Sequence, residues 1–176
     1  MKSLLALAFI SLVLLLPLQS GAGTLESPSP AKPVPLKVGN AAPDFKLDTP
    51  QGKTISLRSF RGKSVLINFW ATWCGPCVDE MHILQQIATE WSSNGLVILG
   101  INEGDPASKV TGFIQRYGIS FPILMDGDQE VSRLYMVRYM PTSVFVDKDG
   151  IVQVVAYGGF DTKESLVSKM LSKVGK

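Results

Sequence analysis

The segment that constrains the fold most strongly is Trp73-Cys74-Gly75-Pro76-Cys77, which holds both cysteines of the chain. The apolar run Ser64–Trp70 in front of it predicts a buried strand, and Val78–Trp91 behind it predicts a helix. The cysteine pair is therefore expected where a strand gives way to the N-terminus of a helix. Free backbone N–H groups and the helix dipole at that place favour a thiolate over a thiol, and the thiolate is the species that attacks disulfides.

The first residues have the pattern of a secretory signal. After an initial lysine, an apolar run extends from Leu4 to Leu16, and Ser20-Gly21-Ala22 is a small-residue cleavage site. We expect cleavage after Ala22, which makes residues 1–22 a signal peptide and the protein an exported, periplasmic one. An uncleaved anchor in the inner membrane is the alternative, because two further residues extend the apolar run towards the roughly 20 that a spanning helix needs.

Residues 23–35 are expected to form an extended linker, because four of them are prolines. The folded domain is expected to cover residues 36–176, which is long enough for one domain with its own hydrophobic core. The net charge of +2, with 17 basic and 15 acidic residues interspersed, gives no reason to expect a nucleic-acid partner. We expect a monomer, since the sequence carries no clear oligomerisation pattern.

The short spacing of the cysteines favours chemistry over a structural role. A disulfide between Cys74 and Cys77 closes almost no loop, so it removes little conformational entropy from the unfolded chain. A zinc site would need further cysteine or histidine ligands, and His82 is the single histidine of the chain. We therefore expect no bound metal and interpret His82 as an ordinary helix residue.

Cys74 is the predicted nucleophile and Cys77 the predicted resolving cysteine. Cys74 stands at the exposed N-terminal side of the motif, whereas Cys77 lies further into the predicted helix and is expected to be shielded. Attack by Cys74 on a substrate disulfide gives a mixed disulfide, and attack by Cys77 then releases the product. Gly75 and Pro76 suit the turn into the helix, because glycine permits tight geometry and an early proline loses no needed N–H group.

Hydrophobic periodicity elsewhere predicts strands that alternate with helices, followed by a terminal hairpin and helix. Such a chain folds as an α/β protein with a mixed central sheet flanked by helices. Gln51-Gly52 predicts the turn of an N-terminal hairpin, Lys148-Asp149-Gly150 the turn of a second hairpin, and Asp161-Thr162-Lys163-Glu164 a capping box. The expected strands are 45–48, 54–57, 65–70, 96–102, 122–125, 142–147 and 151–157, and the expected helices are 77–91, 108–117, 129–137 and 161–174.

The run from Val65 to Cys77 resembles the active-site segment of the thioredoxin superfamily. More narrowly, it is similar to the TlpA/ResA-like branch of bacterial exported thiol–disulfide oxidoreductases, and the resemblance covers about residues 36–173. The resemblance implies a thioredoxin-like fold with an N-terminal β-hairpin and a central strand–helix insertion, which we place at 122–137. It also implies a redox-active disulfide between Cys74 and Cys77, and we expect no cofactor.

A second motif, Met140-Pro141-Thr142, supports this resemblance. In the superfamily a proline at this place is cis and packs beside the disulfide, which assigns that role to Pro141; the alternative is an ordinary proline at the start of a strand. The backbone of Met140 is then expected to pair with an extended substrate segment. The resemblance further implies that Trp73 packs beside the disulfide and, with Gly75 and Pro76, shapes the docking surface.

The resemblance also suggests which acids could move protons. Asn68 stands where thioredoxin has a buried aspartate that serves the resolving cysteine, and an amide cannot take that role. The TlpA/ResA-like branch instead places an acid after the next strand, where Asp105 fits best and Glu103 is the nearby alternative. A carboxylate desolvated beside two sulfurs would have a raised pKa and could exchange protons near neutral pH. The alternative for each acid is a solvated loop charge.

Glu80 matches a further acid of the branch, three residues after the second cysteine. His82 departs from the pattern, because the branch has a proline at that place. Glu80 is therefore either a residue that faces the active site or a charge that favours the N-terminal region of the helix.

These features predict a dithiol reductant that faces the periplasm and reduces disulfides of a narrow set of exported proteins. The resemblance implies a membrane thiol donor as the source of electrons and apocytochrome c, before haem attachment, as a typical substrate. Oxidation or isomerisation of secreted proteins is the alternative, because it uses the same residues and the sequence does not fix the stability of the Cys74 thiolate.

Other classes fit the sequence less well. A copper metallochaperone on the same fold would have a wider cysteine spacing and a distant histidine, and a redox-inert structural domain would have an unreactive Cys74. A peroxidase of the peroxiredoxin type would have a threonine three residues before the reactive cysteine, whereas Thr72 lies two residues before Cys74.

Overall fold

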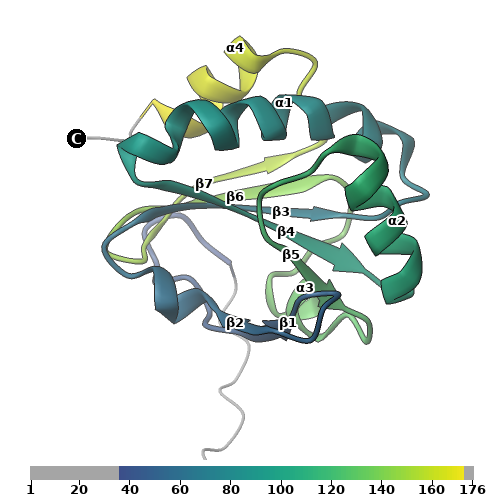
Figure 1. The fold of residues 1–176 in the computed structure, drawn as a ribbon. Helices are drawn as coiled ribbons and strands as arrows, with labels where there is room; N and C mark the ends of the chain where they lie inside the picture. Colours follow the sequence, from purple (N-terminus) through teal and green to yellow (C-terminus); the bar gives the residue numbers. More distant parts are fainter. Residues whose placement is uncertain (1–35, 173–176) are drawn as a thin grey trace, which may run out of the picture. The chain divides into compact units, whose positions relative to one another are not determined.

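The computed structural model describes residues 36–172. These residues form one mixed β-sheet with helices packed against it (Figure 1). Its strands are β1 (Lys46–Asp48), β2 (Thr54–Ser56), β3 (Ser64–Trp70), β4 (Leu96–Glu103), β5 (Ile123–Asp126), β6 (Thr142–Val146) and β7 (Val152–Tyr157). The order in the sheet is β2-β1-β5-β4-β3-β6-β7. The helices are α1 (Gly75–Trp91), α2 (Ala107–Tyr117), α3 (Glu130–Leu134) and α4 (Lys163–Leu166), with short 3-10 turns at Leu57–Phe60 and Ser92–Asn94 and a π-helical turn at Val167–Leu171.

The central strand β3 is buried along its length. It runs parallel to β4 and antiparallel to β6, and every residue after Ser64 is buried. The apolar run of β3 fits a strand that is covered on both faces of a sheet. The register places Asn68, a polar residue in this run, between Gly100 of β4 and Ser143 of β6.

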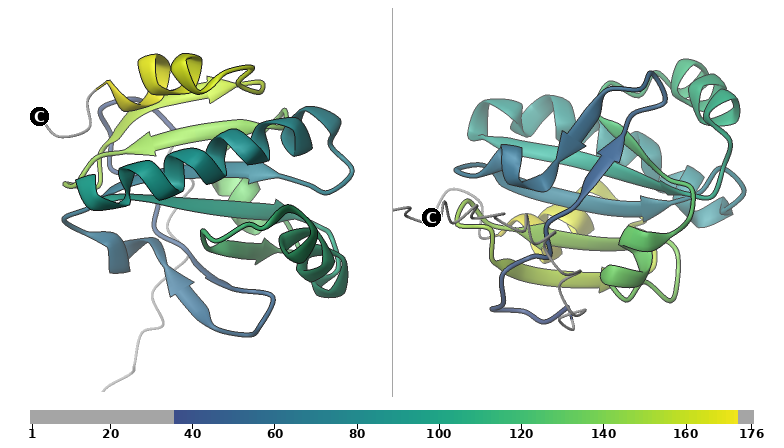
Figure 2. Two further views of the ribbon diagram at one scale, coloured as in Figure 1. Left: turned by 45° about the horizontal axis from the view of Figure 1, so that its top comes forward. Right: turned by 90° about the horizontal axis from the view of Figure 1, so that it is seen from below.

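Alternate residues of the central strands face two separate hydrophobic clusters. Ile98 of β4 belongs to the cluster that includes α1, α2 and α4, whereas the next residue, Leu99, belongs to the cluster that includes α3 and the N-terminal segment of the domain. Figure 2 shows α1 and α4 on one face of the central strands, and Figure 1 shows α3 on the opposite side, while β1 and β2 extend the same sheet beyond β5. The first of these faces carries the cysteine pair, because α1 begins at Gly75.

The predicted hairpins and the central insertion are confirmed. β1 pairs with β2 and β6 pairs with β7, both antiparallel, and Gly52 and Gly150 take left-handed backbone in the two turns. β5 and α3 form the expected strand–helix insertion between α2 and β6. The α/β class with a mixed sheet is therefore as predicted.

The limits of α1 and α3 differ from the prediction. α1 begins at Gly75 rather than at Cys77, because Pro76 fits the first turn of a helix, where its missing N–H group is not needed. α3 covers only Glu130–Leu134, because Gln129 and Met136 have left-handed backbone, with φ of 60° and 54°.

The start of the last helix also differs from the prediction. The predicted capping box of Asp161 and Glu164 is wrong by one residue. Thr162 is the N-cap and its hydroxyl accepts a hydrogen bond from the Ser165 N–H at 3.1 Å. The backbone is α-helical only to Leu166 before the π-helical turn begins.

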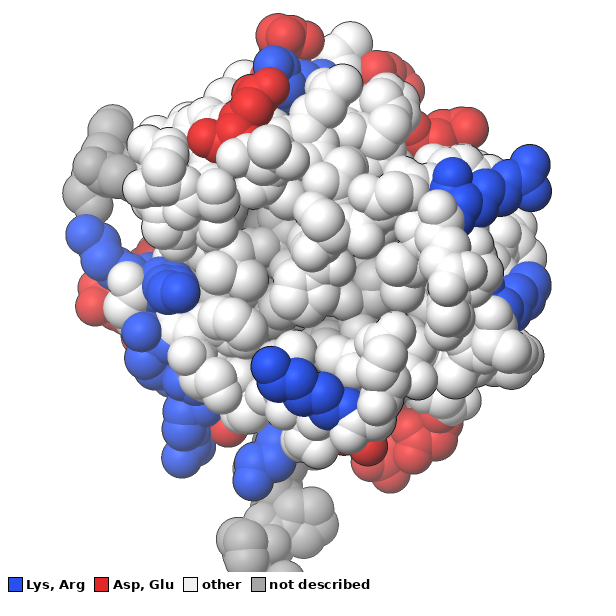
Figure 3. Space-filling view, in the orientation of Figure 1, with Lys and Arg blue, Asp and Glu red and all other residues white. Residues whose placement is uncertain are grey.

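The surface gives no sign of a large charged interface on the face seen in Figure 3. Acidic and basic side chains both lie around its rim, and its centre carries neither. Within residues 36–172 we find no helix that is both long and apolar enough to cross a membrane. The predicted signal peptide, 1–22, and the predicted linker, 23–35, lie outside the described residues.

Replacement of Gly100 by alanine is expected to lower the free energy of unfolding by about 1–3 kcal/mol. A Cβ atom on this buried residue of β4 would lie 2.6 Å from Ile123 Cδ1 and 3.2 Å from Trp70 Nε1, so the core must shift. Gly112→Ala in α2 is the matched control, because its Cβ would meet nothing within 4 Å. The control should gain up to about 1 kcal/mol from helix propensity. Urea unfolding of both variants checks this, and a Gly100→Ala protein as stable as the parent would contradict it.

Candidate active site

The cysteine pair lies at the junction of β3 and α1. Cys74 is the N-cap of α1, and a disulfide with an S–S distance of 2.07 Å joins it to Cys77 in the first turn. Cys74 is 7 % exposed and Cys77 is 0 % exposed. In a reduced site, Cys74 is therefore the sulfur that an incoming disulfide can approach, and the dipole of α1 favours its thiolate.

The loop before β6 lies against the first turn of α1. The Met140–Pro141 peptide bond is cis. A Cβ atom on Gly159 would lie 3.4 Å from the Pro76 carbonyl oxygen, 3.5 Å from Glu80 Oε2 and 3.7 Å from Pro141 Cγ, so these groups surround one point. Met140 is half-buried before it. The structure therefore brings Pro76 of the first motif and Pro141 of the second into one region.

Two aromatic side chains near the disulfide are exposed. Trp73 is 65 % exposed and Tyr139 is 70 % exposed. Trp70, by contrast, is fully buried in the core, where its ring packs on Phe113 with centroids 4.8 Å apart. Exposed large aromatic side chains are typical of surfaces that contact a partner. The predicted docking role of Trp73 stays a prediction.

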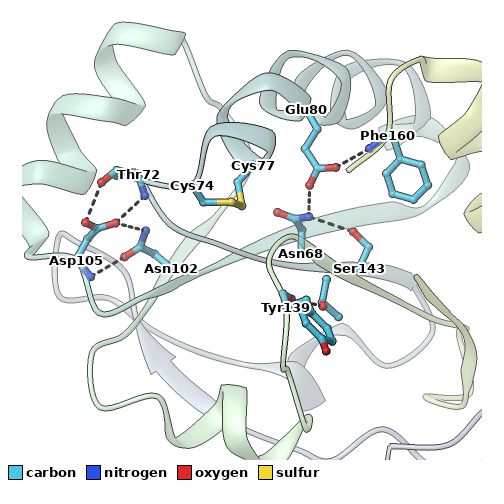
Figure 4. Close-up of a disulfide and its surroundings, with 11 residues drawn as sticks. Asn68, Thr72, Cys74, Cys77, Glu80, Asn102, Asp105, Tyr139, Ser143 and Phe160 are labelled. Carbon is cyan, nitrogen blue, oxygen red and sulfur yellow. Dashed lines mark hydrogen bonds between the residues drawn. A yellow bond between two sulfur atoms is a disulfide. The ribbon is translucent and has the colours of Figure 1, made fainter. Parts of the chain in front are cut away.

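Glu80 lies on the same face of α1 as the resolving cysteine. It follows Cys77 by three residues, so both side chains lie on the same face of α1, and both are fully buried. Glu80 Oε1 accepts a hydrogen bond from Asn68 Nδ2 at 2.7 Å, and Oε2 accepts one from the Phe160 N–H at 3.1 Å (Figure 4). Burial of the carboxylate raises the pKa of Glu80 to about 7, although both hydrogen bonds oppose the rise.

Asn68 joins this acid to the sheet. Its Nδ2 also donates to Ser143 Oγ of β6 at 3.0 Å, while its buried Oδ1 has no hydrogen-bond partner among the described residues. The network of Glu80, Asn68, Ser143 and Phe160 was not foreseen as a unit. The spacing of Glu80 from the second cysteine was a signal in the sequence, but the register that sets Ser143 opposite Asn68 was not.

Asp105 holds the loop in front of the disulfide. Its carboxylate accepts hydrogen bonds from the Thr72 N–H at 2.7 Å, the Thr72 hydroxyl at 2.8 Å, Asn102 Nδ2 at 3.1 Å and Lys109 Nζ at 3.0 Å. Burial tends to raise the pKa of Asp105, but these donors outweigh it and hold the pKa below its usual value. The expected raised pKa is therefore wrong for Asp105, because the carboxylate is satisfied by donors.

Glu103 lies on the other side of the sheet. Burial raises its pKa, a hydrogen bond with Ser132 lowers it, and the charge of Asp126 raises it. Since neighbouring strand residues face opposite sides, Glu103 points away from Asn102 and towards α3. The pKa of Glu103 is therefore raised, as expected, but its side chain lies on the opposite side of the sheet from α1 and the disulfide.

The chain matches a known family over most of its length. The family model described as the AhpC/TSA family matches residues 38–155. The chain belongs to this family.

Named relatives give a narrower relation. The thiol-disulfide oxidoreductase ResA of Geobacillus thermodenitrificans is 39 % identical over 129 residues, which cover 73 % of this chain and 74 % of that protein. ResA of Halalkalibacterium halodurans is 33 % identical over 138 residues, which cover 78 % and 77 %. A crystal structure of a putative thiol:disulfide interchange protein DsbE from Chlorobium tepidum has a TM-score of 0.75 at 30 % identity and covers 80 % of this chain and 99 % of that one.

These similarities confirm the predicted thioredoxin-like fold and the ResA-like branch. With a cysteine pair at the position described above, this member of the AhpC/TSA family is a thiol–disulfide oxidoreductase. Its substrates are disulfide-bearing proteins. His82 is exposed on α1, and residues 36–172 contain no cluster of three or more His, Cys, Asp or Glu side chains that could hold a metal ion.

The pKa of Glu80 predicts a pH-dependent stability. Because the pKa is about 7 in the folded protein and 4.5 ordinarily, its contribution to stability is fully present below pH 4.5 and is lost as pH rises through 7. Glutamine does not ionise, so the Glu80→Gln protein does not lose this contribution. The free energy of unfolding of the variant minus that of the parent should therefore increase by about 3 kcal/mol between pH 4 and pH 8, at roughly 1.4 kcal/mol per pKa unit.

Urea unfolding of the oxidised proteins between pH 4 and pH 8 measures this difference. Glu164→Gln is the matched control, because Glu164 is exposed in the first turn of α4. A parallel pH dependence of Glu80→Gln and the parent would show that Glu80 ionises at an ordinary pKa.

Proposed function

We propose that the protein is a dithiol reductant for disulfides of a narrow set of exported proteins. The observation that carries this proposal is the asymmetry of the cysteine pair: Cys74, at the helix N-terminus, keeps a small exposed fraction, whereas Cys77 is fully buried on the helix face that carries Glu80. The resemblance to the TlpA/ResA-like branch supports apocytochrome c, before haem attachment, as a substrate, and a membrane thiol donor as the source of electrons.

The proposed site lies outside the cytoplasm. Residues 1–22 export the chain, or anchor it in the inner membrane if they are not cleaved, residues 23–35 link them to the domain, and residues 36–176 carry the reaction. The composition of these segments supports the proposal. The domain acts as a monomer, without a cofactor.

The reaction exchanges two electrons and two protons. The Cys74 thiolate attacks one sulfur of the substrate disulfide, a bond forms between the two sulfurs, and the other substrate sulfur leaves as a thiolate. Cys77 then attacks the sulfur of Cys74, which releases the second substrate thiol and leaves the Cys74–Cys77 disulfide. The substrate disulfide is reduced to two thiols, and the dithiol of this protein is oxidised. A membrane dithiol restores it by the reverse exchange.

Glu80 is the proposed proton acceptor for Cys77. The buried Cys77 thiol must lose its proton before it attacks, and water does not reach it. The Glu80 carboxylate lies on the same helix face and has a pKa of about 7, so it can accept a proton near neutral pH. Asn68 positions this carboxylate. Asp105 positions Thr72 in front of Cys74 instead.

Replacement of Cys77 by alanine is expected to trap substrates. Without the resolving thiol, the mixed disulfide on Cys74 persists and can be isolated from the host cell under non-reducing conditions. One or a few exported partners, apocytochrome c among them, are the expected adducts. The variant with both cysteines replaced is the control and should retain none.

Many unrelated secreted adducts would instead indicate an oxidase or isomerase. No adducts on a Cys74 shown to be reduced and accessible would contradict disulfide exchange altogether.

Replacement of Glu80 by glutamine is expected to slow the release step by about 100-fold or more, because general-base catalysis typically contributes that much. In the parent the rate of release should rise with pH through about 7 as Glu80 ionises, whereas in Glu80→Gln it should rise only with ionisation of the thiol. Single-turnover decay of a preformed mixed disulfide measures this rate between pH 5 and pH 9.

Asp105→Asn is the matched control for a buried acid. It should lower stability, because Thr72 and Lys109 lose a charged acceptor, but keep the parent's pH midpoint. Equal pH profiles for Glu80→Gln and the parent would exclude Glu80 as the proton acceptor.

A further inference from the structure

A groove of about 510 Å³ opens beside Cys74, between the N-terminal part of α1 and the outer face of α2. We call it the α1–α2 groove; its lining includes Trp73, Gly75, Gly112, Phe113, Arg116 and Tyr117. Trp73 and Gly75 are the direct chain neighbours of Cys74, so the groove begins one residue away from the reacting cysteine, which does not itself line it. Neither Met140 nor Pro141 lines it, so the groove is distinct from the surface at the cis-proline.

The walls of the groove are aromatic and supported from beneath. Trp73 and Tyr117 are 65 % and 44 % exposed. Tyr117 stacks on Phe113 with ring centroids 4.3 Å apart and 27° between planes, and Phe113 rests on the buried Trp70. The Tyr117 wall is therefore a fixed surface, because rings in the core hold it. The volume of the α1–α2 groove lies within the roughly 300–1,000 Å³ that is typical of ligand-binding sites.

Glycine keeps the floor of the groove open. Gly112 lies in the middle of α2, where glycine is among the least favourable residues, and it is exposed. A Cβ atom at Gly112 or at Gly75 would meet nothing within 4 Å, so neither glycine is required by packing within the described chain. Larger side chains at these two positions would project into the space above them.

A cation lies at the edge of the aromatic wall. The guanidinium carbon of Arg116 is 5.7 Å from the centroid of the Tyr117 ring. Lys109, a second cation of the groove, is held by Asp105 at 3.0 Å. A ring between Trp73 and Tyr117 would therefore meet aromatic faces and, at its rim, a guanidinium group, and both attract an aromatic side chain.

We propose that the α1–α2 groove binds an aromatic side chain of the oxidised protein substrate, two residues from the cysteine that Cys74 attacks. This inference rests on the proposed function. In an extended segment, residues two apart point in the same direction and lie about 7 Å from each other. A substrate cysteine that points at Cys74 thus directs the side chain two positions away towards the neighbouring groove. The groove selects substrates by that residue.

Short peptides test the proposal directly. Each peptide carries one cysteine as a mixed disulfide with thionitrobenzoate, with tryptophan or alanine two positions before or after the cysteine. The reduced protein displaces coloured thionitrobenzoate as Cys74 bonds to the peptide, and Cys77 then releases the peptide thiol. We expect the tryptophan peptide to react about 3- to 10-fold faster than the alanine peptide at one of the two positions.

The variant Gly112→Leu assigns the effect to the groove. Leucine should fill the floor and bring the ratio of the two rates to about one, while the melting temperature stays equal or rises. Gly127→Leu is the matched control, because its Cβ would also meet open space and it does not line the groove. The control should keep the parent's ratio.

Each other outcome overturns the inference. Equal rates for tryptophan and alanine peptides, with exchange intact, would refute the groove but leave the oxidoreductase function standing. A preference that survives Gly112→Leu and disappears in Tyr139→Ser would place the aromatic side chain at the cis-proline loop. Equal peptide rates together with slower reduction of Gly112→Leu by membrane vesicles of the host would assign the groove to the electron donor. Failure of the reduced protein to react with any peptide would contradict the proposed function itself.

Discussion

The pairing of β3 with β4 on one side and β6 on the other is the constraint on which the site depends. β3 is buried on both faces, so a one-residue shift of its register would exchange the side chains that fill the two hydrophobic clusters and would turn the polar Asn68 away from Glu80. That register sets Asn68 beside Ser143 and fixes where β3 ends. Since Cys74 caps the helix that follows, the position of the disulfide is a consequence of strand pairing in the core.

Hydrogen-bond donors, rather than burial alone, separate the two acids on the α1 side of the sheet. Asp105 accepts four hydrogen bonds, one of them from a charged lysine, and its negative charge is stabilised. Glu80 is fully buried and accepts two hydrogen bonds from neutral groups, which leave the charged form poorly compensated. A buried carboxylate with a near-neutral pKa weakens the fold at physiological pH. Such local conflicts are typical of functional positions.

Much of the fold could be predicted from the sequence, because its strands are strongly apolar and its turns carry glycine at the positions that need it. The limits of the helices were less certain. The left-handed residues Gln129 and Met136, which confine α3, are not glycines, and no local pattern marks them. The redox role of the cysteine pair could also be predicted, because a spacing of two residues, without further metal ligands, is typical of a redox-active disulfide.

The surroundings and pKa values of the candidate acids could not be predicted from the sequence. Asp105 and Glu103 are two residues apart in the sequence, yet they lie on different sides of β4, and their pKa values change in opposite directions. The spacing of Glu80 from Cys77 is visible in the sequence, but its hydrogen bond with Phe160, 80 residues later in the chain, is not. Contacts of that kind follow from the assembled sheet, and one sequence does not reveal them.

The hydrogen bond from the Phe160 N–H to Glu80 joins the segment after β7 to the acid that we propose as the proton acceptor of Cys77. The packing is close at Gly159, because a Cβ atom there would already be in van der Waals contact with the Pro76 carbonyl, the Glu80 carboxylate and Pro141, and a side chain extending further towards them would displace them. The connection between β7 and α4 is therefore closely packed against the active-site residues at Gly159. Surface loops usually tolerate insertions, deletions and grafted tags, but this loop should be among the least permissive sites of the domain for such engineering.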